Sequence, residues 1–246
     1  MEYAPSCNIM TRTMKLISNL FMLCAAFAVV SCGELFEFET ELPKVDGLYL
    51  SHHEIDIHVG DTITFGTELV PDTVQASYYW LVKGDEGAVE LAGRKLRAMK
   101  PGRALVVVQA QTLNIDNTEN VVSDSCYVNV FEWHDCEPGE FLYETVLYSS
   151  LVIDGVQMTD SLGNTRLVAV VDGEVRANAE MREEKGIPYL QMRIKGAWPG
   201  EEASIECYVP ELHERFVFGT LILDGETHGT LSDLKRYRGV SRNYKK

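Results

Sequence analysis

The chain has 246 residues and a formal net charge of −15, from 37 acidic and 22 basic residues. A protein that follows nucleic-acid phosphates needs a basic surface, so this balance argues against a nucleic-acid partner. Six cysteines in a chain of this length are too few for a fold that depends on a disulfide framework.

Residues 1–31 have the features of an export signal. Arg12 and Lys15 precede an apolar run over residues 16–30, which is shorter than the roughly 20 residues that cross a bilayer. We therefore expect this segment to be cleaved and to take no part in the fold. Met14 is a more natural start than Met1.

Cys32 follows the small residue Ser31 at the end of the apolar run. The residues Val29-Val30-Ser31-Cys32 resemble the lipobox of bacterial lipoproteins. This resemblance implies cleavage before Cys32, lipidation of that cysteine and a lipid anchor in the bacterial outer membrane, on its periplasmic or its outer face. A plain secretory signal or an uncleaved anchor is the alternative.

Residues 32–44 predict a tether between the lipidated cysteine and the folded part. They carry four glutamates and Pro43 without a sustained period. Fully extended, such a run reaches on the order of 40 Å. Phe36 and Phe38 alternate, which leaves an edge strand as the other interpretation.

Residues 45–132 predict a β-sandwich. Apolar and polar residues alternate with a period of two, and glycine or proline turns recur about every 10 residues. The predicted strands cover residues 54–59, 62–65, 78–82, 88–91, 104–110 and 126–131. No helical period of useful length separates them, and the polar segment Asn114–Asn120 predicts a long hairpin loop.

Several features of residues 47–131 occur in a familiar order. Gly60 lies between two strands, Trp80 lies in a central strand, and the segment 95–98 precedes Pro101-Gly102 and a final alternating strand. This order resembles the group 2 bacterial Ig-like domains. The resemblance implies a β-sandwich of the kind found in surface adhesins and glycan-handling proteins.

Residues 137–234 predict a second sandwich, so the fold class is all-β with two tandem Ig-like β-sandwich domains. Three Asp-Gly pairs, at 154–155, 172–173 and 224–225, are flanked by alternating strands and predict hairpins. Residues 167–176 resemble a C-terminal β domain common in cell-envelope proteins of Bacteroides-type bacteria, a resemblance that implies no activity. The basic tail 235–246 predicts a solvated or disordered segment.

His52, Glu54, Asp56 and His58 share one parity. In a regular strand they project from one face, about 7 Å apart. Such residues can ligate a divalent metal, but a solvent-facing sandwich surface has the same alternation. We favour the solvated face and expect no metal or other cofactor.

The junction Trp133-His134-Asp135-Cys136 combines nucleophilic and metal-capable side chains. A cysteine nucleophile needs an electropositive setting, whereas Cys136 has acidic neighbours, so we expect a packed hinge with Trp133 between the domains. Cys126 and Cys136 are close enough in sequence for a disulfide. Because the chain contains no motif of a known catalytic type, we do not expect an enzyme.

Aromatic residues give the stronger functional candidates. Tyr78, Tyr79 and Trp80 are consecutive, so at least one must face away from the core of a sandwich. Trp198 lies in the loop segment 196–200, where an exposed ring can stack on a sugar or a partner surface. The alternative is that Trp198 folds back over a sheet end.

These features predict a non-catalytic, lipid-anchored cell-envelope protein. In the first hypothesis it is a binding or adhesion module for a glycan or a partner protein. In the second it is a structural accessory subunit of a surface assembly, such as a glycan-uptake complex or a fimbria, in which a sheet edge docks to a neighbour.

Overall fold

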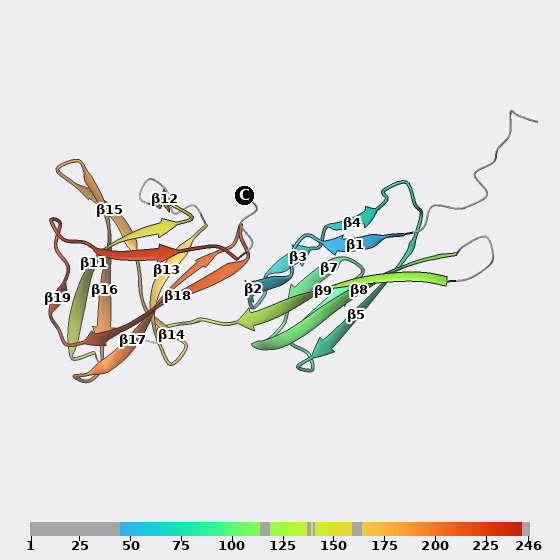
Figure 1. Ribbon diagram of the computed structural model, residues 1–246. Helices are drawn as coiled ribbons and strands as arrows, with labels where there is room; N and C mark the ends of the chain where they lie inside the picture. Colours follow the sequence, from blue (N-terminus) through green and yellow to red (C-terminus); the bar gives the residue numbers. More distant parts are fainter. Residues whose placement is uncertain (1–44, 114–118, 137–138, 140, 159–163, 243–246) are drawn as a thin grey trace, which may run out of the picture. The chain divides into compact units, whose positions relative to one another are not determined.

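The computed structural model describes residues 45–136, except 114–118, together with residue 139 and residues 141–158 and 164–242 (Figure 1). These residues form twenty strands and no helix, which confirms the all-β prediction. Within this part of the chain, accordingly, no helix has the length and apolarity to cross a membrane. The predicted export signal, Cys32, the tether and most of the loop 114–120 lie outside the described residues.

The first sandwich contains nine strands in three sheets. Their bounds are β1 (Gly47–Leu50), β2 (Glu54–His58), β3 (Thr62–Thr64), β4 (Thr67–Val70), β5 (Ser77–Gly84), β6 (Val89–Ala92), β7 (Lys95–Ala98), β8 (Gly102–Leu113) and β9 (Glu119–Phe131). The strand orders are β2-β9-β8-β5, β3-β7-β6 and β1-β4. Strands β2 and β9 run parallel, whereas β5 and β8 run antiparallel.

Alternate residues of these strands form the first core. Val106 and Val108 of β8 and Val128 of β9 are fully buried, as are Phe65 and Leu96 from the facing side. The period of two read from the sequence therefore marks the inward face correctly.

Trp80 does not lie in a central strand, contrary to the prediction. Strand β5 is at the edge of its sheet because the two longest strands, β8 and β9, occupy the middle. The indole still reaches the core, where it stacks on Phe65 with 5.9 Å between ring centroids.

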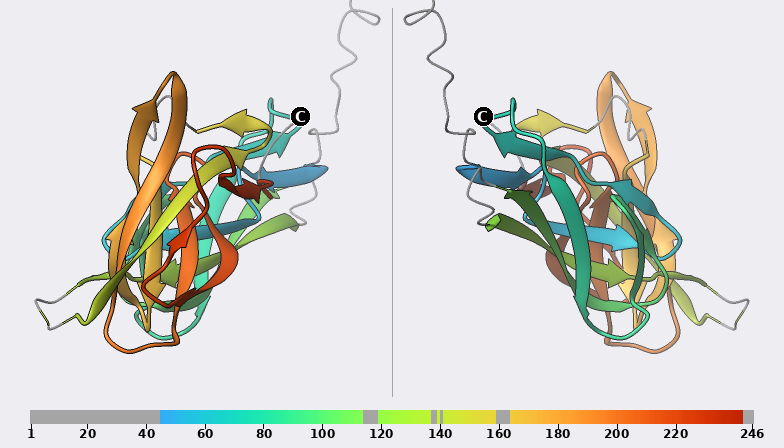
Figure 2. Two further views of the ribbon diagram at one scale, coloured as in Figure 1. Left: turned by 90° about the vertical axis from the view of Figure 1, so that its left-hand side faces the viewer. Right: turned by 90° about the vertical axis from the view of Figure 1, so that its right-hand side faces the viewer.

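The second sandwich contains the remaining strands. Their bounds are β10 (His134–Asp135), β11 (Tyr143–Ile153), β12 (Val156–Gln157), β13 (Arg166–Val171), β14 (Glu174–Asn178), β15 (Glu180–Glu184), β16 (Ile187–Gly196), β17 (Glu201–Val209), β18 (Glu214–Leu223), β19 (Thr227–His228) and β20 (Lys235–Gly239). One sheet has the order β10-β14-β13-β17-β18, and the other has the order β12-β11-β16-β15, with β19 and β20 paired to β11. Figure 2 shows the β15–β16 hairpin in orange.

Two of the three Asp-Gly pairs form the predicted hairpin turns. Asp154 and Gly155 have φ of 51° and 80° between β11 and β12, and Asp172 and Gly173 have φ of 49° and 84° between β13 and β14. These positive values are typical of type I′ turns. The prediction is wrong at 224–225, because β19 follows this pair and joins β11 instead of returning along β18.

The solvated-tail prediction is wrong for residues 235–239. They form β20, which pairs in parallel with β11 from Ser149↔Lys235 to Ile153↔Gly239. Tyr237 explains the difference, because its ring packs against the second core and lies 5.2 Å from the ring of Phe218. The basic residues on either side of Tyr237 are exposed, and their charge dominates the sequence pattern.

The packed hinge is confirmed. Phe131 and Trp133 are buried in a cluster with residues of β13, β14 and β17, namely Val168, Val170, Val175 and Tyr208. The indole Nε1 of Trp133 donates to Glu206 Oε2 at 2.8 Å, so the ring also has its polar group satisfied.

The disulfide between Cys126 and Cys136 is not formed. Cys126 is fully buried in the core of the first sandwich, whereas Cys136 is half-buried just after β10. Closeness in sequence therefore does not bring these two sulfurs together, because β9 directs the first one into the core.

Candidate functional site

The turn between β16 and β17 presents Trp198 to solvent. The residue is 55% exposed, while Trp133 is buried and Trp80 is half-buried. Trp198 is therefore the most exposed of the three tryptophans of the chain. More than half of the surface of this residue is open to solvent.

Hydrogen bonds to its backbone groups fix this turn. The Tyr143 hydroxyl lies within hydrogen-bonding reach of the carbonyl oxygens of Trp198 and Leu223, the second at 2.9 Å. Gly200 N donates to Leu223 O at 3.1 Å. Desolvation, with the carboxylates of Glu201 and Asp224, raises the pKa of Tyr143, so its hydroxyl stays a donor at neutral pH.

Glu201 holds the turn through a buried hydrogen bond and an ion pair. Its carboxylate is almost fully buried, accepts from Ala197 N at 2.8 Å and pairs with Arg176 Nη2 at 3.3 Å. Arg176 also pairs with Glu174 at 3.0 Å and lies over the ring of Phe141 at 4.9 Å. A buried carboxylate is tolerated when it is paired and hydrogen-bonded in this way.

An exposed indole on a fixed turn offers a flat apolar face to a ligand. Because the backbone beneath it is already ordered, binding costs little conformational entropy. Stacking on the apolar face of a sugar or on a partner's side chain uses this arrangement. Trp198 was a candidate from the sequence, whereas Tyr143 and Glu201 were not. Tyr143 is 55 positions from Trp198, so no local pattern links it to the turn, but Glu201 directly follows the turn and could have been found there.

The other aromatic candidates lie on β5 in the first sandwich. Tyr78 is 42% exposed and Tyr79 is 52% exposed, and successive strand residues project to opposite faces of a sheet. The candidates for ligand contact therefore form two groups, one on β5 and one at the Trp198 turn.

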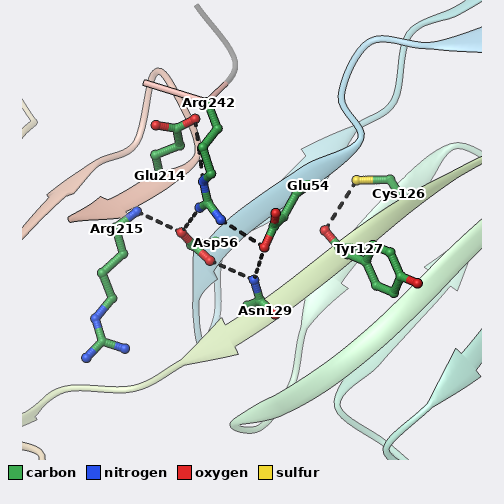
Figure 3. A network of polar contacts seen from close by, with 8 residues as sticks. All are labelled: Glu54, Asp56, Cys126, Tyr127, Asn129, Glu214, Arg215 and Arg242. Atoms are coloured by element: carbon green, nitrogen blue, oxygen red, sulfur yellow. Dashed lines mark hydrogen bonds and ion pairs between the residues drawn. The ribbon is translucent and has the colours of Figure 1, made fainter. Parts of the chain in front are cut away.

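Figure 3 shows where the acidic metal candidates lie. Asp56 accepts from the Asn129 side chain at 2.9 Å and from Arg215 N at 3.1 Å, and it also contacts the Arg242 guanidinium. Glu54 pairs with Arg242 at 2.8 Å and accepts from Asn129 at 3.2 Å. Arginine and amide donors therefore surround both carboxylates in an ion-pair network. The prediction of a solvated face is wrong here, because these partners bury Asp56 and leave Glu54 half-buried.

The histidines of the same candidate set also have protein partners. His58 Nε2 accepts from Trp133 N at 3.1 Å, and its Nδ1 lies 2.9 Å from Val59 O, so both ring nitrogens have protein partners. His52 Nδ1 lies 2.9 Å from Ser51 Oγ. Over the described ranges, no group of three or more His, Cys, Asp or Glu residues is placed to hold a metal ion.

A hollow of about 330 Å³ is a further candidate, but its aromatic walls offer little free surface. Its lining includes His58, Asp61, Trp133, Arg166 and Tyr208. The two aromatic residues are almost fully buried, the Tyr208 hydroxyl donates to Asp61 at 2.9 Å, and the Arg166 guanidinium lies 5.4 Å from the centroid of the Trp133 ring. The Trp198 turn is therefore the better ligand surface.

The three thiols in the described part of the chain, those of Cys126, Cys136 and Cys207, are poor nucleophiles. Burial raises the pKa of both Cys126 and Cys207 to about 12, which keeps them protonated at neutral pH. Desolvation and the Glu174 carboxylate also raise the pKa of Cys136.

The strand topology defines this chain as a protein of tandem β-sandwiches, and comparison with known proteins adds nothing to that class. No family model and no curated protein matches the chain, so the resemblance to group 2 Ig-like domains stays a prediction. The similar solved structures include SGBP-B of the Bacteroides ovatus mixed-linkage glucan utilization locus, in complex with a mixed-linkage heptasaccharide. It is 12% identical with a TM-score of 0.24 over 75% of this chain and 48% of that one.

Two further similar structures are an S-layer protein and a T cell receptor. Domains 5–6 of the S-layer protein SbsC are 11% identical with a TM-score of 0.28, over 77% of this chain and 100% of that one. A marsupial T cell receptor is 12% identical with a TM-score of 0.24, over 73% of this chain and 97% of the receptor chain. This chain spans about half the length of SGBP-B, and TM-scores at this level define no common function.

Proposed function

We propose that this chain is a non-catalytic, lipid-anchored protein of the bacterial cell envelope that binds a glycan through Trp198. The observation that carries the proposal is Trp198, a 55% exposed tryptophan on a turn held by Tyr143 and Glu201. A single ring on a fixed turn suits the small apolar face of a sugar better than the much larger contact area of a protein interface.

Three features of the described residues support a non-catalytic role. The three thiols have raised pKa values, both nitrogens of His58 are occupied, and the carboxylates of Glu54 and Asp56 are held by arginine and asparagine. Catalytic acids, bases and nucleophiles need an accessible group with a pKa suited to the reaction.

The proposed membrane anchor rests on the lipobox-like segment that ends at Cys32. Mass spectrometry of the mature N-terminus tests it directly, and we expect a chain that begins at an acylated Cys32. An unmodified first residue, or cleavage beyond Cys32, would show that the anchor is wrong while leaving the glycan proposal untouched.

A glycan array tests the binding proposal. We expect the full chain to bind a defined set of glycans and Trp198→Ala to lose at least about tenfold in affinity, which equals roughly 1.4 kcal/mol. Trp198→Phe keeps an aromatic face and should retain part of the binding. Val217→Ala is the matched control. It shortens an exposed apolar side chain on β18, away from the Trp198 turn, and should bind normally.

Tryptophan fluorescence gives an independent readout, because the other two tryptophans are buried or half-buried. A bound glycan should change the emission of the wild type and leave that of Trp198→Ala unchanged. Binding that survives Trp198→Ala would place the site elsewhere. An array without any bound glycan, together with a co-purifying envelope protein, would favour the accessory-subunit hypothesis.

A further inference from the structure

Strand β5 is an apolar sheet edge without the usual protection. Among the described strands, it pairs on one side alone, with β8, in an unbroken register from Ser77↔Gln111 to Gly84↔Ala104. Its eight residues include no proline and one charged residue, Lys83. Tyr78, Tyr79, Leu81 and Val82 are each 40% to 52% exposed.

The other sheet edges of the described residues are each protected. Strand β15 is mostly charged, β20 carries three basic residues, and β1, β3, β4, β6, β10, β12 and β19 are four residues long or shorter. Strand β18 has a register shift against β17 and a glycine with φ of 119°. The backbone of β2 is covered where Asp56 N donates to His213 O at 2.7 Å. Short length, charge and bulges are the devices by which proteins guard such edges, and β5 has none of them beyond the single charge of Lys83 near its end.

We infer that β5 pairs antiparallel with β5 of a second copy of this chain, which joins two four-stranded sheets into one. A two-fold axis normal to the sheet keeps every side chain on its own face, so paired residues must come from the same face. Centring the axis on Trp80 satisfies this condition. Tyr79 of each copy then faces Leu81 of the other, and Tyr78 faces Val82.

This register covers every exposed apolar side chain of the strand. Lys83 lies opposite Ser77 of the other copy, so no like charges meet across the pair although the chain as a whole carries −15. Centring the axis on Leu81 instead would set Lys83 against Tyr79 and leave Tyr78 opposite a glycine. The complementarity of β5 with itself is what identifies a second copy as the occupant.

Sedimentation velocity of the full chain in detergent tests this pairing. We expect a concentration-dependent dimer at about 100 μM, a weak affinity of roughly 5.5 kcal/mol. The double variant Tyr79→Lys/Leu81→Lys sets like charges directly opposite and should weaken the dimer at least tenfold. In Tyr79→Lys/Leu81→Glu the same two apolar groups are lost, but each lysine faces a glutamate, and the dimer should return.

Circular dichroism of both double variants shows whether they fold. Met181→Lys, which adds a charge to the edge strand β15, is the matched control and should leave dimerisation unchanged. A monomeric wild type, or a dimer unaffected by the two lysines, would overturn the inference. Equal loss in both double variants would overturn the register and with it the argument for a second copy. None of these outcomes depends on glycan binding.

Discussion

Strands β5 and β15 are both sheet edges, and they differ in almost every property that governs pairing. In β15, four of the five residues are charged, and Arg182 pairs with Glu180 in the open. In β5, one of the eight residues is charged and tyrosines are exposed on both faces. Both present unpaired backbone groups, but charge makes β15 costly to cover. The two edges therefore differ in chemistry and not in position, and this difference is the basis for the inferred docking of β5.

The two strands are also held differently. Trp80 anchors β5 to its core through its stack on Phe65. All five residues of β15 are exposed, so this strand depends on its backbone pairing with β16 from Glu180↔Gln191 to Glu184↔Ile187. We therefore expect β5 to be a rigid edge and β15 to open more easily.

The largest expected effect comes from removing the anchor of β5. Trp80→Ala should lower the free energy of unfolding by about 2–4 kcal/mol, because it deletes a large ring from a packed site. Met181→Ala on β15 should cost less than about 1 kcal/mol. Urea unfolding followed by circular dichroism measures both. Equal losses in the two variants would mean that β5 is not anchored through its tryptophan.

A second prediction converts the guarded edge into an open one. Arg182→Val/Glu184→Val removes two charges from one face of β15, and in the Tyr79→Lys/Leu81→Lys background it should restore concentration-dependent association by at least about tenfold. Sedimentation velocity is the measurement, with Arg182→Glu/Glu184→Lys as the charged control. If the charged control associates equally well, charge on β15 does not prevent pairing at this edge.

Thiol labelling gives a third and more local test. Burial raises the pKa of Cys126 and Cys207 from 9.0 to about 12, so both are protonated and slow at pH 8. Trp80→Ala should speed labelling of Cys126, which shares its core, and leave Cys207 in the second sandwich unchanged. Alkylation followed by mass spectrometry separates the two sites. Labelling should rise as the pH approaches 12, because the thiolate is the reactive form.

Much of the fold was predictable because alternation reports burial directly. The inward faces of β8 and β9, and the turns at 154–155 and 172–173, follow from patterns within a few residues. The edge position of β5 was not predictable, because sheet order depends on pairings between distant segments. The turn at 185–186 was missed for a local reason, since Lys185 takes φ of 54° without being one of the residues typical of such turns.

The site was predictable only in its outermost residue. Trp198 was a candidate because it lies between Gly196 and Gly200 in a predicted loop. Its support by Tyr143 comes from 55 positions away, which no spacing encodes, whereas Glu201 is a local partner that the sequence pattern did not single out. The basic composition of the tail predicted a solvated segment, and this was wrong because the partners of the tail are also distant in the sequence. Arg242 contacts Asp56, 186 positions away in the chain, and Tyr237 packs in the second core.

The smallest expected effect concerns the ion pair on β15 itself. Arg182 and Glu180 are 49% and 67% exposed, so water screens their attraction, and Arg182→Ala should change the free energy of unfolding by less than about 1 kcal/mol. The pair guards the edge by making it costly to cover and contributes little to the fold. A much larger loss in urea unfolding would show that β15 is held by its charges, and the contrast with β5 would then lie in stability rather than in protection.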